Sequence, residues 1–421
     1  MKKQAILISA IASNQGKTLL TMALLHYFKK NVRPFKCGPD FIDPQFHTHI
    51  ADTPSINLDG YMMNQLQLQW IFQNYMDKDI AVVEGVMGYY DGMDKGASAY
   101  DVAKTLQIPS LLLLDGSGSY ITIAAVLQGM LSFREDNTIK AVVINKVSSK
   151  MHYELIKKHI EAECKGIVVC GYIEKNLLLL ESTHLGLDLK ALQDDKIDSL
   201  TKEVLANIEM DVLSSVMDIT LEKNDAYPFE AIKKENKCCV LVHDSNFSFV
   251  YHDNIEYLKE RFDELVIVDA TRNEKIPEHA DMVILPGGYV ETDISYAKIQ
   301  HATIFQNSLI QHASAGKRIY GECAGLIYLG RKIDEKVMSS LLPLVFELTN
   351  KRERLGYYQC ELDGRVIKGH AFHYSKVLQA PQSNIKLYKV SKKTAKDGGW
   401  RVDNIFGTYL HTMWRVSGLP I

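Results

Sequence analysis

A chain of 421 residues is longer than one ordinary hydrophobic core needs, so we expect two or three domains. Hydrophobic residues make up 46% and charged residues 24%, the balance of a globular protein, and a net charge of −3 gives no sign of binding to nucleic acid or an anionic membrane. The 7 cysteines are scattered and odd in number, which argues against a zinc site or a disulfide framework and fits reduced thiols in a cytoplasm.

The amino-terminus resembles the start of a signal peptide, since Lys2 and Lys3 precede a short apolar run over residues 5–12. Gly16-Lys17-Thr18 follows almost at once, so a buried strand that feeds a loop explains both features better. No run approaches the ~18 apolar residues of a membrane span. We expect a soluble, cytoplasmic protein.

Short apolar runs alternate with stretches of helical length in the first half of the chain. The stretches of helical length are 18–30 and 120–133. The apolar runs lack period-two alternation, which predicts fully buried strands at 5–9, 32–35, 80–83, 110–114 and 141–144. Repeated strand–helix–strand order predicts an α/β fold with a parallel sheet, whose ligands bind at the carboxyl ends of the strands.

A polar segment, 222–237, contains Pro228 and lacks a strand-like run, so we interpret it as a linker. It separates a first domain, 1–221, from a second, 238–421. The strand pattern then restarts, with predicted strands at 238–242, 265–268, 282–285 and 318–320. The sequence therefore predicts two α/β domains.

Residues 10–18 (AIASNQGKT) connect the first predicted strand to the first predicted helix. Backbone N–H groups at a helix N-terminus, the ammonium of Lys17 and the hydroxyl of Thr18 suit a nucleoside triphosphate with its Mg²⁺. The GxxxxGK[ST] pattern is incomplete, because Ile11 occupies the first glycine position. GKT alone is common by chance, but its place directly after a buried strand favours nucleotide binding.

Charged residues follow the next two strands. Lys36, Asp40 and Asp43 come after one, and Glu84 and Asp91 come after the other. Because parallel strands end at the same sheet edge, these groups should meet the loop that carries Lys17, where carboxylates hold the metal needed for phosphoryl transfer. Asp40 and Asp43, each taken alone, also fit turn or N-cap residues.

Asn145 ends the predicted strand 141–144. An asparagine in this position either reads the edge of an adenine base or caps the strand. The sequence does not decide between the two.

Cys323 lies in Gly321-Glu-Cys-Ala-Gly325, which has the form of a tight strand-to-helix turn that exposes a nucleophile. The backbone N–H groups of Gly288 and Ala324 are candidates for an oxyanion site, and His411 is the candidate base. A small buried hydrophobe is the alternative for the cysteine, but it does not explain the flanking glycines. Three competing histidines fit ordinary structural roles: His243, His370 and His373.

Together these motifs closely resemble the cobyrinic acid a,c-diamide synthase family over nearly the whole chain. The most specific elements are Pro34-Phe-Lys-Cys-Gly-Pro-Asp-Phe-Ile-Asp43, Asn57-Leu-Asp-Gly60, Val83-Glu-Gly-Val-Met-Gly88, Tyr90-Asp-Gly92, Leu285-Pro-Gly-Gly-Tyr289, Cys323-Ala-Gly-Leu326 and Gly369-His-Ala-Phe-His-Tyr-Ser375.

The resemblance implies a P-loop ATP-binding domain like dethiobiotin synthetase, followed by a class I glutamine amidotransferase-like domain. It implies Mg²⁺ near Thr18, Asp43 and Glu84, and it places Lys36 toward the γ-phosphate and the substrate carboxylate, with Asp40 and Asp91 nearby. Cys323 would be the nucleophile and His411 its base. The implied ATP-binding loop consists of Ser13, Asn14, Gln15, Gly16, Lys17 and Thr18.

Three features depart from the family. The loop has Ala10, Ala12 and Asn14 where relatives carry more glycine, although asparagine tolerates left-handed backbone. Many glutaminases of this broad type place a glutamate two residues after the base, where this chain has Met413. Relatives in this family also often lack that glutamate, so only the residue that orients His411 is open. The chain is also somewhat short, which we interpret as trimmed loops.

The resemblance predicts a ligase that uses ATP and L-glutamine to amidate the a and c acetates of cobyrinic acid through acyl phosphates. It implies a corrinoid substrate. Composition and charge predict no nucleic-acid and no membrane partner, and the sequence leaves the oligomeric state open, with a homodimer as one option. The rivals are the same chemistry on nickel-sirohydrochlorin or other corrin side chains, and a nucleotide-dependent switch with an inactive glutaminase scaffold. Glutamine hydrolysis separates the last from the others.

Overall fold

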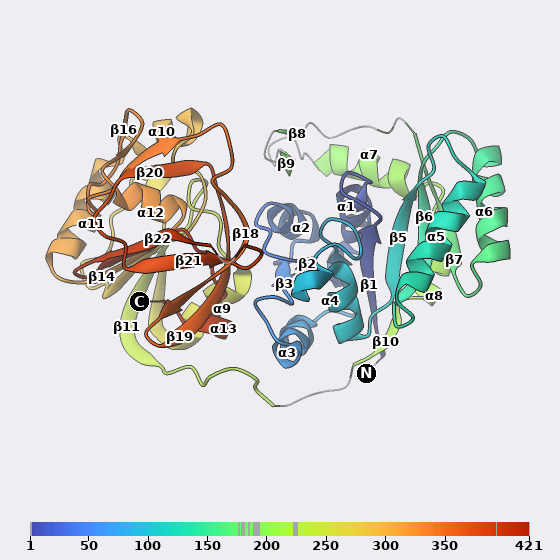
Figure 1. Ribbon diagram of the computed structural model, residues 1–421, viewed down its shortest axis with the longest axis horizontal. Helices are drawn as coiled ribbons and strands as arrows, with labels where there is room; N and C mark the ends of the chain where they lie inside the picture. The colour runs from blue at the N-terminus through green and yellow to red at the C-terminus, as the bar shows by residue number, and fades with distance from the viewer. Residues whose placement is uncertain are drawn as a thin grey trace. The chain divides into compact units, whose positions relative to one another are not determined.

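The computed structural model describes residues 2–175, 177, 182–183, 186–187, 194–221, 226–392 and 394–420 (Figure 1). The chain divides into two compact units, Met1–Pro228 and Phe229–Ile421. Residues 222–225 of the predicted linker lie outside the described residues, and strand β11 (Glu235–Val242) begins before the linker was expected to end. No helix among the described residues is long and apolar enough to cross a membrane.

The first unit is built on a sheet of eight described strands, of which seven run in the order β3-β2-β4-β1-β5-β6-β7. All neighbours in this order are parallel. The strands are β1 (Lys2–Ala10), β2 (Val32–Cys37), β3 (Ile56–Leu58), β4 (Ile80–Glu84), β5 (Ser110–Asp115), β6 (Ile139–Val147) and β7 (Val168–Glu174). The eighth, β10 (Asp218–Thr220), pairs with β1 in antiparallel sense, an exception to the predicted parallel sheet. In a separate two-stranded sheet, β8 (Ser182–Thr183) pairs with β9 (Gly186–Leu187) in antiparallel sense.

Helices cover both faces of this sheet. Strand–helix–strand connections are right-handed, so a connection that runs along the sheet in one direction places its helix on one face, and a connection that runs the other way places its helix on the opposite face. Helix α1 packs against α2 and α7, whereas α3 packs against α4 and α5 against α6. The helices are α1 (Lys17–Tyr27), α2 (Asp43–Ala51), α3 (Gln65–Tyr75), α4 (Ala99–Leu106), α5 (Ile121–Phe133), α6 (Lys150–Glu163), α7 (Asp194–Leu205) and α8 (Met210–Ser215).

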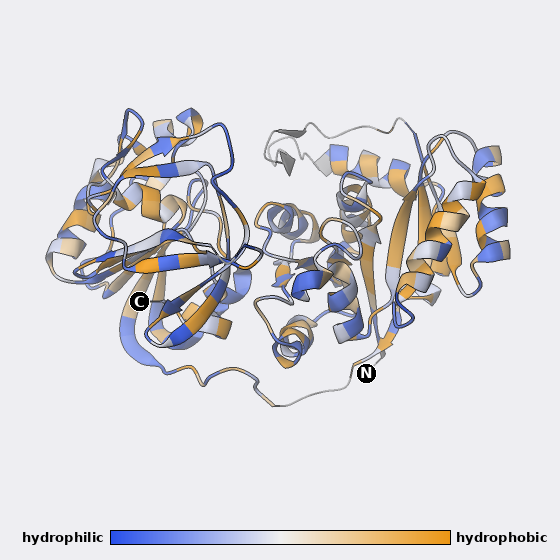
Figure 2. Ribbon diagram, in the orientation of Figure 1, coloured by the Kyte–Doolittle hydropathy of each residue, from blue (hydrophilic) through white to orange (hydrophobic). Residues whose placement is uncertain are grey.

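The strands of the first sheet are apolar because both of their faces are buried. Ile6 and Ile8 of β1 pack with Leu20 and Leu24 of α1 in one core, and all four are fully buried. Figure 2 shows these strands as predominantly hydrophobic and α6 as mixed. The buried runs at 5–9, 32–35, 80–83, 110–114 and 141–144 therefore lie within β1, β2, β4, β5 and β6, as predicted.

The second unit contains a nine-stranded sheet among its described residues, in the order β12-β11-β13-β14-β23-β22-β21-β18-β19. The first five are parallel and the rest antiparallel. The bounds are β12 (Phe262–Val268), β13 (Met282–Leu285), β14 (Arg318–Glu322), β23 (Ile405–Thr408), β22 (Ala395–Val402), β21 (Ile385–Lys389), β18 (Arg354–Leu362) and β19 (Arg365–His373).

A smaller sheet in the order β16-β15-β17-β20 accompanies it. Its strands are β15 (Lys332–Ile333), β16 (Lys336–Val337), β17 (Val345–Leu348) and β20 (Ser375–Gln379). The helices of this unit are α9 (His252–Arg261), α10 (Asp293–Ile299), α11 (Thr303–Ser314), α12 (Ala324–Leu329) and α13 (Trp414–Ser417).

Candidate active sites

The loop between β1 and α1 has the left-handed backbone that a phosphate-cradling turn requires. Gly16 has φ +94° and Asn14 has φ +61°. A Cβ atom on Gly16 would lie 2.5 Å from Nδ2 of Asn145, so a larger residue is excluded there. The loop therefore keeps its shape with asparagine in one of the two left-handed positions.

Asn145 holds this loop from the end of β6. Its Nδ2 donates to the carbonyl oxygen of Gln15 at 2.8 Å, and its Oδ1 accepts from the N–H of Lys146 at 2.8 Å. Both ends of the amide thus bind main chain, which is the capping role. Contact with an adenine base stays a prediction.

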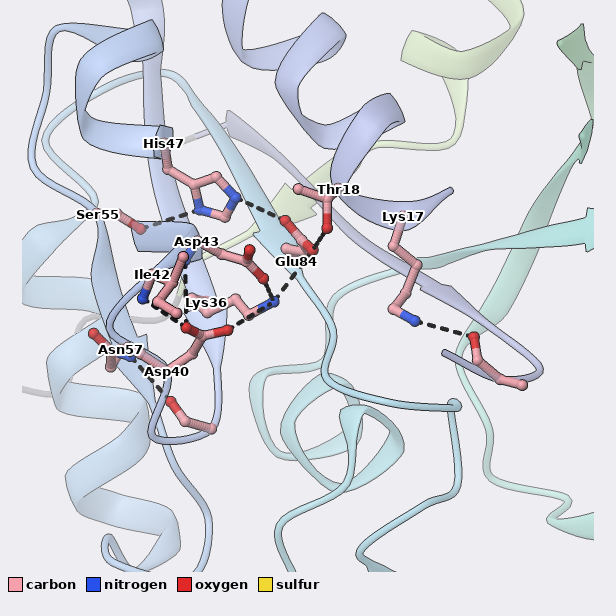
Figure 3. Close-up of polar contacts among 12 residues, drawn as sticks. Lys17, Thr18, Lys36, Asp40, Ile42, Asp43, His47, Ser55, Asn57 and Glu84 are labelled. Atoms are coloured by element: carbon pink, nitrogen blue, oxygen red, sulfur yellow. Dashed lines mark hydrogen bonds and ion pairs between the residues drawn. The ribbon is translucent and has the colours of Figure 1, made fainter. Parts of the chain in front are cut away.

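Lys17 lies in the first turn of α1, and its Nζ donates to the carbonyl oxygen of Ala12 at 3.1 Å. Burial, followed by the positive charge of Lys36, lowers the pKa of the Lys17 ammonium. Figure 3 shows Lys17 apart from the group around Lys36. A phosphate would offer this ammonium a stronger acceptor than the carbonyl it now binds.

Lys36 is the centre of a buried group of charges. Lys36 on β2 and Glu84 on β4 are paired in register, so the parallel sheet brings them side by side. Nζ of Lys36 lies 2.5 Å from Oδ2 of Asp43, 3.2 Å from Oε1 of Glu84 and 3.6 Å from Oδ2 of Asp40 (Figure 3). Burial opposes the ammonium charge, but these carboxylates outweigh it and raise the pKa of Lys36 well above its usual range.

Glu84 links this group to the phosphate loop. Its Oε1 accepts from Oγ1 of Thr18 at 2.7 Å, and its Oε2 lies 2.7 Å from Nε2 of His47. Burial disfavours the charge of Glu84, but Lys36 and His47 outweigh burial and hold its pKa well below the usual range. Burial and the adjacent charge of Glu84 raise the pKa of Asp43 to about 7.

The sequence analysis missed His47, which is fully buried on α2. The available signal was its spacing, because Asp43 and His47 are four residues apart in a helix and share one face. The sequence assigned no separate role to Asn57. Its Nδ2 donates to the carbonyl oxygens of Gly38 and Asp40, at 3.0 and 2.7 Å, and fixes the turn that carries Asp40.

The oxygen atoms of Thr18, Asp43 and Glu84 converge on one region at the end of the sheet. Hydroxyl and carboxylate oxygens are hard ligands of the kind that Mg²⁺ takes from a protein, with water and phosphate oxygens completing its shell. The hydroxyl of Thr18 donates to Glu84 directly, and the ammonium of Lys36 contacts both Asp43 and Glu84. The donor set therefore fits the predicted magnesium site.

Asp91 serves the loop rather than the Lys36 group. Its Oδ2 accepts from the N–H of Gly88 at 2.9 Å, and the N–H of Tyr89 in this turn donates to the carbonyl oxygen of Ala10 at 2.9 Å. A Cβ atom on Gly88 would lie 2.3 Å from the carbonyl oxygen of Ile11. A role for Asp91 in phosphoryl transfer stays a prediction.

Cys323 occupies a strained turn between β14 and α12 in the second unit. Its φ is +48°, which a residue other than glycine rarely adopts. A Cβ atom on Gly325 would lie 2.0 Å from the carbonyl oxygen of Leu285, and one on Gly321 would lie 2.7 Å from Cδ1 of Leu329. Both flanking glycines are thus required by close packing, as a nucleophile turn demands.

His411 follows β23, the strand beside β14. Its N–H and carbonyl groups pair with those of His370 at 2.8 and 3.0 Å, and a Cβ atom on Gly287 would lie 2.3 Å from its Cε1. Burial lowers the pKa of His411, but hydrogen bonds and charge from Cys323 and Glu322 outweigh it and raise that pKa to about 10. The imidazole therefore contacts both the thiol and a carboxylate.

The competing histidines are placed differently. His373 stacks on Tyr409 with ring centroids 3.7 Å apart, and its Nδ1–H donates to the carbonyl oxygen of Ser375 at 2.8 Å. Burial and Arg354 lower the pKa of His373 to about 3, so this ring is neutral. Burial also lowers the pKa of His243.

The oxyanion residues lie at two fixed turns. Gly288 has φ +148°, and a Cβ atom there would lie 2.0 Å from the carbonyl oxygen of Asn246. Ala324 is the first residue of α12, directly after Cys323. Binding of an oxyanion by their N–H groups stays a prediction.

Glu322 is the residue that the sequence analysis missed in this site. Its Oε2 lies 3.6 Å from Nδ1 of His411, and both side chains are 3% exposed. The sequence signal was a glutamate that ends an apolar strand and directly precedes the nucleophile. Met413, in the position where a glutamate was sought, is buried.

One further group of ligand-type side chains lies among the described residues of the second unit. Cys238, Glu264 and His279 have ligand atoms within 4.8 Å of one another. Glu264 and His279 are exposed and pair at 3.0 Å, so a surface ion pair explains their proximity. Cys238 lies near the start of β11, at the sheet edge opposite Cys323.

Comparison with known proteins agrees with this division of the chain. Residues 239–418 match the model of the CobB/CobQ-like glutamine amidotransferase domain, and residues 4–181 match that of an AAA domain. The cobyrinate a,c-diamide synthase of Fusobacterium nucleatum is 34% identical over 97% of each chain. That of Caldanaerobacter subterraneus is 31% identical over 97% of this chain and 94% of its own length. A P-loop nucleotide-binding domain is therefore joined to a glutamine amidotransferase domain.

Proposed function

The chain belongs to the cobyrinate a,c-diamide synthase family of glutamine-dependent amidotransferases, and on this premise we propose that it amidates the a and c acetates of cobyrinic acid with ATP and glutamine. The observation that carries the proposal is the strained Cys323 turn with His411 against it, in a chain that also holds a phosphate loop ringed by carboxylates. One site suits release of ammonia, and the other suits activation of a carboxylate.

In the second unit, His411 accepts the thiol proton of Cys323, and the sulfur attacks the side-chain amide carbon of glutamine. The tetrahedral oxyanion forms beside Gly288 and Ala324. The C–N bond breaks as His411 returns the proton to the leaving nitrogen, which departs as ammonia. Water then hydrolyses the thioester, which releases glutamate and restores the thiol.

In the first unit, the γ-phosphoryl group of ATP passes to a carboxylate oxygen of the substrate, which leaves ADP and an acyl phosphate. Ammonia attacks the acyl carbon, and inorganic phosphate leaves to give the amide. In this proposal Lys36 neutralises charge on the transferred phosphoryl group, and Lys17 binds the nucleotide phosphates. Thr18, Asp43 and Glu84 would hold Mg²⁺, which supplies charge neutralisation between the phosphate oxygens.

The test uses the full-length protein with Mg-ATP, cobyrinic acid and either glutamine or ammonium, with product mass as the readout. With either nitrogen source, the mass of the product should decrease twice, each time by the difference in mass between OH and NH₂. Cys323→Ala should abolish the glutamine reaction and retain the ammonium reaction. Failure of ammonium to support Cys323→Ala, while it supports the unaltered protein, contradicts the assignment of separate sites.

The same experiment separates the alternatives. Glutamine hydrolysis with unchanged cobyrinic acid points to another macrocycle, and nickel-sirohydrochlorin is then the next substrate. Absence of glutamine hydrolysis and of amidation favours the nucleotide-dependent switch with an inactive scaffold. The homodimeric state stays a prediction, tested by the mass of the protein in solution.

A further inference from the structure

Glu322 is a buried carboxylate at the carboxyl end of β14, 2% exposed. Three donors bind its Oε1: the hydroxyl of Tyr320 at 2.8 Å, the indole N–H of Trp414 at 3.2 Å and the hydroxyl of Thr412 at 3.3 Å. Donors from β14 and from the segment after His411 thus fix one oxygen atom. Such a set compensates for the loss of water around a buried carboxylate.

The other oxygen atom faces the base. Oε2 of Glu322 lies 3.6 Å from Nδ1 of His411, and both groups are almost completely buried. This distance exceeds that of a strong hydrogen bond, but electrostatic attraction at this range is substantial where water is excluded. The imidazole also interacts with the thiol of Cys323, which contributes to the raised pKa of His411. Carboxylate, imidazole and thiol therefore follow one another in the order of a catalytic triad.

We propose that Glu322 is the positioning residue of this site: its Oε2 keeps a proton on Nδ1 of His411 and stabilises the imidazolium that forms when His411 takes the thiol proton of Cys323. This inference deepens the proposed glutaminase reaction and rests on it. Glu322 lies immediately before the nucleophile, and it takes the role of the glutamate that many glutaminases have two residues after the base, where this chain has Met413.

The exchange Glu322→Gln tests this role with little change of shape. A glutamine retains a carbonyl oxygen for Tyr320, Thr412 and Trp414, but it turns an amide N–H toward Nδ1 of His411. That donor favours the tautomer whose Nε2 carries a proton, which cannot accept one from Cys323. The same kind of exchange in a serine protease triad lowers kcat about 10⁴-fold, so we expect at least about a 100-fold loss of glutamine-dependent kcat. Ammonium-dependent amidation should stay within about twofold.

Alkylation of Cys323 by iodoacetamide supplies a readout that needs no turnover of glutamine. The titratable groups that face His411 are Cys323, Glu322 and His373. Loss of the Glu322 charge destabilises the imidazolium, so fewer thiolates form and alkylation at neutral pH should slow by about tenfold or more. Peptide mass mapping restricts the measured rate to Cys323.

Tyr320→Phe is the matched control, because it removes one hydrogen bond to the same carboxylate and leaves Oε2 beside His411. A purely structural role predicts that both variants lower thermal stability while Cys323 keeps its alkylation rate in the folded protein. The positioning role predicts slow alkylation in Glu322→Gln alone, with partial recovery in Glu322→Asp, which retains the charge.

A wild-type alkylation rate of Cys323 in folded Glu322→Gln overturns the proposal. If that variant does not fold, a wild-type rate in Glu322→Asp overturns it, because the shorter side chain withdraws the carboxylate and should still slow the reaction. If the unaltered protein does not hydrolyse glutamine, the proposed function is refuted instead. The alkylation comparison still decides whether Glu322 controls His411.

Discussion

Gly325→Ala is expected to destabilise the second unit strongly, although it adds only one methyl group. The new Cβ atom would lie 2.0 Å from the carbonyl oxygen of Leu285 and 2.8 Å from its carbonyl carbon. Both atoms belong to the backbone of β13, a buried strand between β11 and β14. The clash therefore cannot be relieved by a side-chain rotation.

The magnitude follows from this lack of freedom. Overpacking in a well-filled core costs about 1–3 kcal/mol, and a clash with strand backbone belongs at about 3 kcal/mol or more. For a unit of this size each kcal/mol lowers the melting temperature by about 2–4 °C, so we expect a decrease of about 6–12 °C. Displacement of the Cys323 turn should also reduce the rate of glutamine hydrolysis. A shift of 1 Å is expected to lower that rate by about 100-fold, and smaller shifts by less.

Differential scanning calorimetry of the full chain measures the first effect, and glutamate release measures the second. Gly129→Ala is the matched control, because nothing lies within 4 Å of a Cβ atom there and the residue is inside helix α5. Alanine in that helix should stabilise by about 0.4–1 kcal/mol. A wild-type melting temperature and wild-type glutaminase activity for Gly325→Ala would refute the close packing of this turn.

Two further predictions concern charged groups. Glu84→Gln and Asp43→Asn should each abolish ATP-dependent amidation with either nitrogen source, because each removes an oxygen ligand at the phosphate site. Glutamine hydrolysis should stay measurable in both variants. Retained amidation would contradict the magnesium assignment. The pKa of His373 is lowered to about 3, so below the ordinary value near 6.5 the unfolded chain binds a proton that the native chain does not. The free energy of unfolding should therefore decrease as the pH is lowered, and this residue accounts for about 2 kcal/mol of the decrease at pH 5. His373→Gln should remove this part of the pH dependence when stability is measured by denaturant unfolding.

Much of the parallel architecture was predicted from local patterns. The runs 5–9, 80–83 and 141–144 are apolar without alternation, because strands covered on both faces need no polar side. The antiparallel strands between Lys332 and Val402 were not predicted. Their burial alternates imperfectly, and their pairing depends on distant partners rather than on a local period.

The catalytic candidates separate in the same way. Gly321-Glu-Cys-Ala-Gly325 and the GKT triplet were recognisable because backbone conformation restricts the residues that fit a tight turn. The contact of His47 with Glu84 was not predicted, since it joins a helix to a strand 37 positions away. The bond from the N–H of Gly88 to Asp91 was not predicted either, and the expected role of Asp91 in phosphoryl transfer stays a prediction.

By itself the sequence determined the strands that are buried on both faces, the two turns that carry Lys17 and Cys323, and the family. These features depend on backbone geometry and on apolar patterning within a few residues. Only the tertiary structure decided which charges share a site: Lys36 with Glu84 by strand register, and Glu322 with His411 by the adjacency of β14 and β23. The physical reason is that electrostatic partners are selected by distance in space and by exclusion of water, and neither is encoded in the spacing of residues along the chain.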